Sequence, residues 1–103
     1  MHQTRRTGQA GLNRDNGLAA PYTRPLNLEL IQRLVDEMVQ VTESQIVAAV
    51  RAVAVDVRLV VEPAGAAAVA ALREGRVSFG PGPTVAVLTG SNVDPGRLAA
   101  WLA

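Results

Sequence analysis

The 103-residue sequence contains no cysteine and no lysine, and its one histidine is His2. Without cysteine the chain has no disulfides, thiolate metal ligands or redox motifs, and its compartment is left open. Without lysine it has no side-chain amine that could form a Schiff base. His2 lies in a polar N-terminal stretch, where we interpret it as incidental rather than catalytic. We therefore do not expect the chain alone to be a complete covalent-catalysis enzyme.

Aromatic residues and long apolar runs are also scarce. Aromatic residues make up 3% of the sequence and hydrophobic residues 49%, so the core has to be built from Ala, Val and Leu. Such small side chains bury little area in a lone small domain, which indicates a fragment. No apolar run approaches the about 20 residues that span a bilayer, and the N-terminus lacks the apolar region of a signal peptide. We expect a cytoplasmic protein with no membrane partner.

The ten basic residues are all arginines, and the formal net charge is +1. Arg5, Arg6 and Arg14 lie in the polar N-terminal stretch, without the interleaved aromatics or basic helix face of a nucleic-acid-binding protein. We predict no nucleic-acid partner, a mobile polar leader over residues 1–14 and a folded part over 15–103. No His/Asp/Glu cluster has metal-ligand spacing, so no metal site is predicted.

Hydrophobic periodicity and capping residues predict four helices. The first begins with Asn27 as N-cap and carries an apolar stripe that extends to Met38. The second begins after Thr42, where Gln45 completes a capping box and Val41 can pack against Ile46. Its predicted buried face consists of Ile46, Val47, Val50, Val53, Ala54 and Val57.

The other two helices follow turn residues. A boundary is predicted between Glu62 and Pro63, and an alanine-rich helix then runs from Ala64 to a C-cap at Gly75. Asp94 is predicted to cap a short last helix with proline at its first position. The side chains expected to dock this helix are Leu98, Trp101 and Leu102.

Two short segments favour strands. Residues 38–41 alternate and are rich in β-branched side chains, and residues 84–88 form an apolar run bounded by glycine and proline. A run without polar alternation is typical of a strand buried on both faces of a parallel sheet. We therefore predict an α/β fold, namely part of a three-layer domain with helices packed on a short parallel sheet.

Two places could hold a ligand. Open α/β sheets bind ligands beyond the carboxyl ends of their parallel strands, and Thr89-Gly90-Ser91-Asn92 follows residues 84–88 directly. The alternative is an ordinary strand-to-helix turn. Glu62 ends an apolar run just before a helix, where it could line a site or only complement the positive helix end. The residues alone leave both alternatives open.

Three motifs occur in order: VTESQI at 41–46, VVEPAGAAAVAAL at 60–72 and VAVLTGSNVD at 85–94. Together they resemble the C-terminal segment of the threonine dehydratase and serine racemase family. These are fold-type II pyridoxal-phosphate enzymes, related to tryptophan synthase β. The resemblance also takes in DNGLAAP at 15–21 and residues 26–39, so it covers nearly everything from Asp15 to Asp94.

The resemblance implies pyridoxal phosphate as cofactor. Thr89 matches the family's Ser or Thr that bonds the pyridine nitrogen, and such a neutral partner leaves the ring a moderate electron sink. Glu62 matches a glutamate that lines the cofactor pocket, and Gly90 and Asn92 belong to the Thr89 motif. Ser91 stands where many members have a second glycine.

The resemblance also shows what the chain lacks. Asn16 replaces the family's usual Asp, so no function is carried over to it. The Schiff-base lysine, the glycine-rich phosphate loop and the small mobile domain lie N-terminal to the part resembled, so no catalytic residue is predicted within this chain.

The expected function is a C-terminal fragment of a threonine/serine dehydratase, an ammonia-lyase that removes water and ammonia from a hydroxy amino acid. We expect it to be inactive alone, with a complementing N-terminal chain or a homo-oligomer as possible partner. The alternatives are half of a split enzyme and a non-catalytic interaction module.

Overall fold

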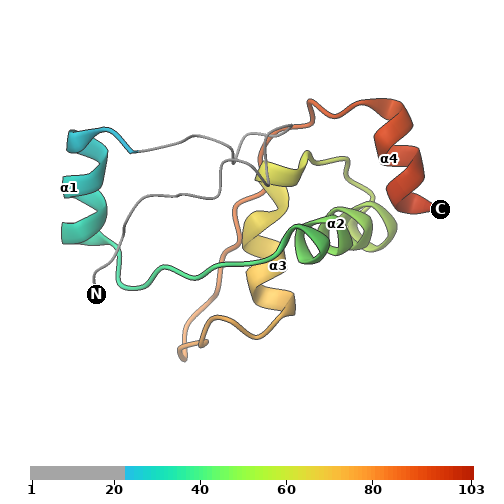
Figure 1. Ribbon diagram of the computed structural model, residues 1–103. Coiled ribbons are helices and arrows are strands. Elements are labelled where there is room, and N and C mark those ends of the chain that lie inside the picture. The colour runs from blue at the N-terminus through green and yellow to red at the C-terminus, as the bar shows by residue number, and fades with distance from the viewer. Residues whose placement is uncertain (1–22) are drawn as a thin grey trace. The chain divides into compact units, whose positions relative to one another are not determined.

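The computed structural model describes residues 23–103 (Figure 1). The chain divides into two compact units, Met1–Val39 and Gln40–Ala103. The described part of the first unit contains helix α1, and the second contains helices α2, α3 and α4. His2, Asn16 and the predicted leader at 1–14 lie outside the described residues.

Helix α1 spans Pro25–Leu34. The predicted start at Asn27 is wrong: Arg24 is the N-cap, because proline at the first position has a preset φ and no N–H that would be left unpaired. The helix ends at Leu34, because Val35 is extended, so Met38 lies beyond it. No α1 residue is buried, and Leu26 and Leu34 are 66% and 71% exposed. The apolar stripe of α1 is therefore unburied in the structure.

Helix α2 spans Glu43–Ala52, and its capping box is confirmed. The Gln45 N–H donates to Thr42 Oγ1 at 3.2 Å, and the Thr42 N–H donates to Gln45 Oε1 at 2.8 Å. The chain then widens into a π-helical turn, η1 (Val53–Val57). The wider turn rotates later side chains off the α-helical face, so the predicted burial of Val57 is wrong: this side chain is 53% exposed.

Helix α3 spans Ala67–Arg73 and follows a 3-10 turn, η2 (Pro63–Ala66). The predicted boundary before Pro63 is confirmed. At the other end Gly75 has φ +66°. The Gly75 N–H donates to the Leu72 carbonyl at 3.2 Å, and the Arg76 N–H donates to the Ala71 carbonyl at 3.0 Å. This pair of bonds is a Schellman motif and confirms Gly75 as the residue that ends the helix.

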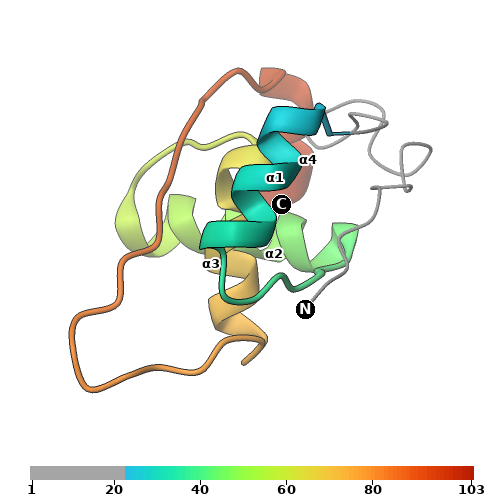
Figure 2. The same ribbon diagram turned by 90° about the vertical axis from the view of Figure 1, so that its left-hand side faces the viewer.

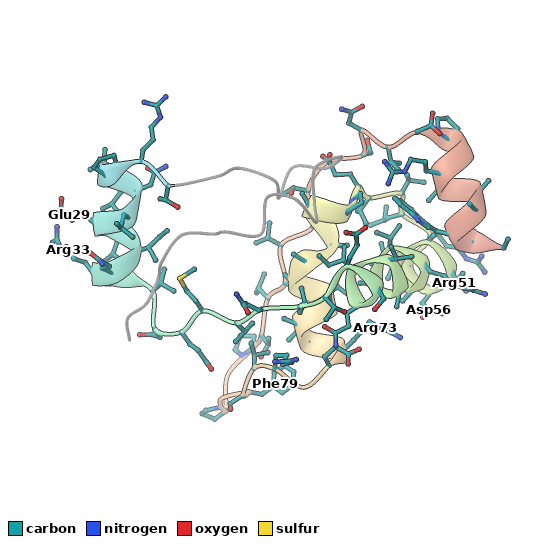
Figure 3. All side chains as sticks on the ribbon, in the orientation of Figure 1. Glu29, Arg33, Arg51, Asp56, Arg73 and Phe79 are labelled. Carbon is teal, nitrogen blue, oxygen red and sulfur yellow. The ribbon has the colours of Figure 1, made fainter. Side chains whose placement is uncertain are left out.

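Helix α4 spans Pro95–Leu102 and begins as predicted, with the Arg97 N–H donating to Asp94 Oδ2 at 3.0 Å. Leu98 and Trp101 pack against the core, and the Arg97 guanidinium lies 5.4 Å from the centre of the Trp101 ring. Arg51 Nη1 donates to the Ala103 carbonyl at 3.2 Å, and Figure 3 shows Arg51 on the part of α2 near the end of α4. Hydrophobic docking and this bond together hold α4 on α2.

The core of the second unit lies where α2 meets η2, α3 and α4. Both views show α2 and α3 crossing at a steep angle (Figure 1 and Figure 2). The buried hydrophobic side chains are Ile46, Ala49, Val50, Val53, Val61, Ala66, Ala70 and Ala71. Alanine at the crossing lets the two helices approach closely. The expectation of a core built from Ala, Val and Leu is confirmed in part for the described residues, because alanine and valine predominate, Ile46 joins them, and leucines only pack against the core.

The predicted sheet is not confirmed, because residues 23–103 contain no strand. The run at 84–88 lies outside the helices without a neighbouring strand (Figure 2). Val85 and Val87 are 82% and 65% exposed, whereas Leu88 is half-buried against the core. A strand requires a neighbour whose N–H and C=O groups pair with its own. In the described part of the chain no such neighbour is present, for either 84–88 or 38–41.

Arg58 offers a test of backbone strain in this unit. It ends η1 with φ 66°, a conformation that costs an L-residue other than glycine about 1 kcal/mol. We expect Arg58→Gly to raise the free energy of unfolding by about 0.5 kcal/mol. Glycine relieves the backbone strain, but its greater freedom in the unfolded chain offsets part of that gain. Urea unfolding followed by the helical circular dichroism signal measures this. Gly75→Ala is the matched reverse change and should destabilise; a destabilising Arg58→Gly would contradict the prediction.

Candidate functional site

Two segments far apart in the sequence meet at Glu62 and the loop that begins with Thr89. The Glu62 N–H donates to the Gly90 carbonyl at 3.1 Å. The Gly65 N–H donates to the Glu62 carbonyl at 2.9 Å and closes the turn at the start of η2. Both backbone polar groups of Glu62 are therefore engaged, one with its own turn and one with the distant loop.

Local sequence explains the backbone conformation of Glu62. Pro63 disfavours the helical region for the residue before it, and Glu62 is accordingly extended, with φ −80° and ψ 162°. Val61 on one side and Ala66 on the other are buried in the core. The core thus fixes both flanks of Glu62, whose own side chain is half-buried.

Each of the two segments contains a glycine that the other segment requires. A Cβ added at Gly65 would overlap the Thr89 carbonyl oxygen and lie 2.6 Å from its carbonyl carbon. A Cβ added at Gly90, which has φ +75°, would overlap a Glu62 carboxylate oxygen and lie 2.7 Å from Glu62 Cδ. We call this reciprocal arrangement of Gly65 with Thr89 and Gly90 with Glu62 the glycine contact.

The structure brings some of the predicted site residues together. Glu62 lies against Gly90 and next to the Thr89 peptide, so parts of two predicted motifs lie side by side. We call the surface formed by residues 61–66 and 88–93 the Glu62–Thr89 edge. Thr89 and Gly90 are exposed. Asn92 lies further along in an exposed turn, which the Val93 N–H closes by donating to the Ser91 carbonyl at 2.9 Å.

Sequence reasoning missed Gly65. Its only signal was a glycine within an otherwise alanine-rich helix start, where glycine is a weak helix former. The structural reason for this glycine is its contact with Thr89, which no local pattern shows.

The edge has a definite chemical character. Thr89 contributes a hydroxyl and Glu62 a carboxylate, and neither 61–66 nor 88–93 contains a basic residue. Such an edge can accept and donate hydrogen bonds, but it offers no positive charge to a phosphate. Among residues 23–103, no group of three His, Cys, Asp or Glu side chains could hold a metal ion. No helix in the same range has the length and apolar character needed to cross a membrane.

Comparison with known proteins identifies the family. Residues 2–90 match the family described as pyridoxal-phosphate dependent enzyme. The chain belongs to this family. The resemblance read from the motifs is therefore confirmed. Members of this family use pyridoxal phosphate in the intact enzyme, and this chain corresponds to a fragment of the fold-type II domain.

Curated relatives narrow the comparison. The chain is 40% identical over 79 residues to an L-threonine ammonia-lyase of Geobacter sulfurreducens and 38% identical over 88 residues to a phenylserine dehydratase of Ralstonia pickettii. It is 34% identical over 94 residues to a mitochondrial threonine dehydratase of Schizosaccharomyces pombe.

These matches cover 77%, 84% and 87% of this chain, respectively. They cover only 20%, 27% and 16% of the relatives, so the chain spans about a quarter or less of their length. No solved structure matches the chain.

The Glu62–Thr89 edge fits one part of pyridoxal phosphate. A pyridine ring needs a hydrogen-bonding partner at its nitrogen and room for close approach, and the edge offers the exposed Thr89 hydroxyl beside Gly90. The phosphate group needs basic side chains or a cradle of backbone N–H groups. The described residues of this edge therefore suit the ring side of the cofactor and not its phosphate.

The glycine contact predicts an unequal response to alanine at two glycines. We expect Gly65→Ala to lower the free energy of unfolding by about 2 kcal/mol, because the new methyl overlaps backbone that has to shift. Gly80→Ala is the control, since a Cβ there meets nothing within 4 Å. Urea unfolding of both variants measures the difference, and equal stabilities would contradict the contact.

Proposed function

We propose that this chain forms the ring-side wall of the cofactor site of a pyridoxal-phosphate-dependent hydroxy amino acid dehydratase, and that it is inactive alone. Membership of the family supports the cofactor. The observation that carries the proposal is the approach of Glu62 to the Thr89 loop, which joins the two motifs in one edge.

Within this proposal each residue has a separate part. When bound, pyridoxal phosphate supplies an electron sink for elimination. The Thr89 hydroxyl hydrogen-bonds the ring nitrogen, and as a neutral group it does not impose a proton there. Glu62 lines the pocket beside it, Gly90 lets the main chain approach the ring, and Asn92 contributes an amide from the next turn.

The substrate class comes from the relatives' names. Threonine and phenylserine both carry a hydroxyl on the carbon next to the α-carbon, and the relatives are named for the loss of water or of ammonia. We infer that the intact enzyme removes both from a β-hydroxy amino acid.

The sheet belongs to the same proposal. Along residues 84–88, Val85 and Val87 are exposed while Ala86 and Leu88 are half-buried. This alternation suits a strand with one face already on the core and the other open to a partner layer. We propose that 84–88 becomes a parallel strand beside the rest of the domain, provided by a longer polypeptide, a complementing chain or another copy.

The same polypeptide would provide the Schiff-base lysine and the glycine-rich phosphate loop. The second candidate function is a non-catalytic interaction module, favoured by the exposure of Val85, Val87 and Phe79. The two candidates differ in what completion of the domain restores: a cofactor site in the first case, association alone in the second.

A chimera tests the proposal directly. The matched segment of the Geobacter sulfurreducens relative is replaced by this chain, and pyridoxal phosphate affinity and 2-oxo acid formation from threonine are measured. We expect Thr89→Val to raise the dissociation constant for the cofactor about 3- to 10-fold, the value of one hydrogen bond. Thr89→Ser keeps the hydroxyl and should bind almost as tightly as the parent chimera.

Thr84→Val is the matched control, because it makes the same change of side chain at a threonine outside the edge. The same loss of affinity in Thr84→Val, or none in Thr89→Val, would contradict the role of Thr89. A folded chimera that binds no cofactor would favour the interaction module.

The full chain alone gives a complementary test. Mixed with pyridoxal phosphate and threonine or phenylserine, it should form no 2-oxo acid above the rate of free cofactor, because it supplies no lysine and no phosphate loop. Turnover measured by a coupled dehydrogenase assay above that background would overturn the inactivity of the isolated chain.

A further inference from the structure

Gly65 lies directly against the peptide of Thr89. It is buried, and a Cβ there would overlap the Thr89 carbonyl oxygen and lie within 3.1 Å of the Thr89 nitrogen. We infer that Gly65 is a positioning residue, which sets the place of the Thr89 hydroxyl without touching the cofactor. This inference rests on the proposed function of Thr89.

The turn that Thr89 contacts, at the start of η2, is held by a hydrogen bond and by the core. The Gly65 N–H donates to the Glu62 carbonyl at 2.9 Å within the turn, and the neighbouring Ala66 is 0% exposed. Thr89, by contrast, is exposed and is followed by a glycine with φ +75°, and its peptide lies directly against Gly65 on the side of the turn. A methyl group at position 65 would therefore displace Thr89 outward rather than move the turn.

The contact between Gly90 and Glu62 does not fix the position of Thr89 in the same way. The atoms nearest to Gly90 belong to the end of the Glu62 side chain, which can rotate away. The atoms nearest to Gly65 are main-chain atoms, which cannot move without moving the loop. The position of Thr89 is thus set by Gly65 and not by the Glu62 carboxylate.

The first test needs no substitution. Amide hydrogen exchange of the full chain, followed by NMR, should show the Glu62 N–H protected to the same degree as the Arg97 N–H, since both donate hydrogen bonds in the structure. An unprotected Glu62 amide beside a protected Arg97 amide would show that the loop leaves the turn, and would overturn the inference even if every Gly65 variant failed to fold.

The second test is a double-mutant cycle in the chimera, with the pyridoxal phosphate dissociation constant as readout. Gly65→Ala should weaken binding about as much as Thr89→Val does. In the Gly65→Ala background, Thr89→Val should then weaken binding by less than about twofold, because the hydroxyl has already left its place. In the control background Gly80→Ala, Thr89→Val should keep its full effect.

A purely structural Gly65 gives another pattern. The effects of Gly65→Ala and Thr89→Val would then be additive, which would overturn the inference and leave the proposed function intact. A parent chimera that folds but binds no cofactor would overturn the proposed function and this inference with it. The cycle therefore separates the two failures.

Discussion

The candidate site depends on a steric constraint, the close approach of Gly65 to the main chain of Thr89, beside which Gly90 lies against the Glu62 side chain. The hydrogen bond from Glu62 to Gly90 also joins them, but a bond of this kind contributes only about 1 kcal/mol net. A side chain at Gly65 would overlap main-chain atoms of Thr89, which costs more than that. Shape therefore decides whether the segments meet, and the hydrogen bond fixes their register once they do. Because Glu62 and Thr89 lie in the two segments that meet here, the same contact places both residues in one edge.

The core that supports this contact is made of small side chains. Small side chains let the helices pack closely, but they bury little apolar area and so contribute little stability. Val50 and Val53 are the largest fully buried side chains, and each contributes about 2 kcal/mol by burial. Val85 and Val87 expose 82% and 65% of their surface, so the segment at 84–88 leaves as many valines outside the core as are fully buried within it. A layer covering that segment would add stabilisation comparable to that of the present valine core. The second unit therefore has a defined core but leaves apolar surface at 84–88 that could add to its stability if it were covered.

Local sequence patterns predicted the ends of elements well, because a cap is a short-range interaction. The confirmed examples are Thr42 with Gln45, the Gly75 end of α3 and the Asp94 cap. The start at Asn27 failed because a competing local rule, proline at the first helical position, prevailed. The sheet failed for a different reason, since the pairing of 84–88 depends on residues elsewhere in the domain. The motif resemblance located Glu62 and Thr89, whereas the requirement for Gly65 is a contact between distant segments that periodicity does not report.

The absence of lysine from the sequence limits what the Glu62–Thr89 edge could do with a cofactor. Under the proposed function Thr89 and Glu62 would bind and orient the ring, and their edge contains no lysine that could form a Schiff base with the cofactor. The edge is shaped by the glycine contact, which lies wholly within the second unit, whereas the strand proposed at 84–88 would require a neighbouring strand. Under the proposed function, completion of the domain would add the reactive amine and the phosphate loop to the ring-side wall. In this proposal the chain would contribute shape to the cofactor site, and the rest of the enzyme would contribute the chemistry.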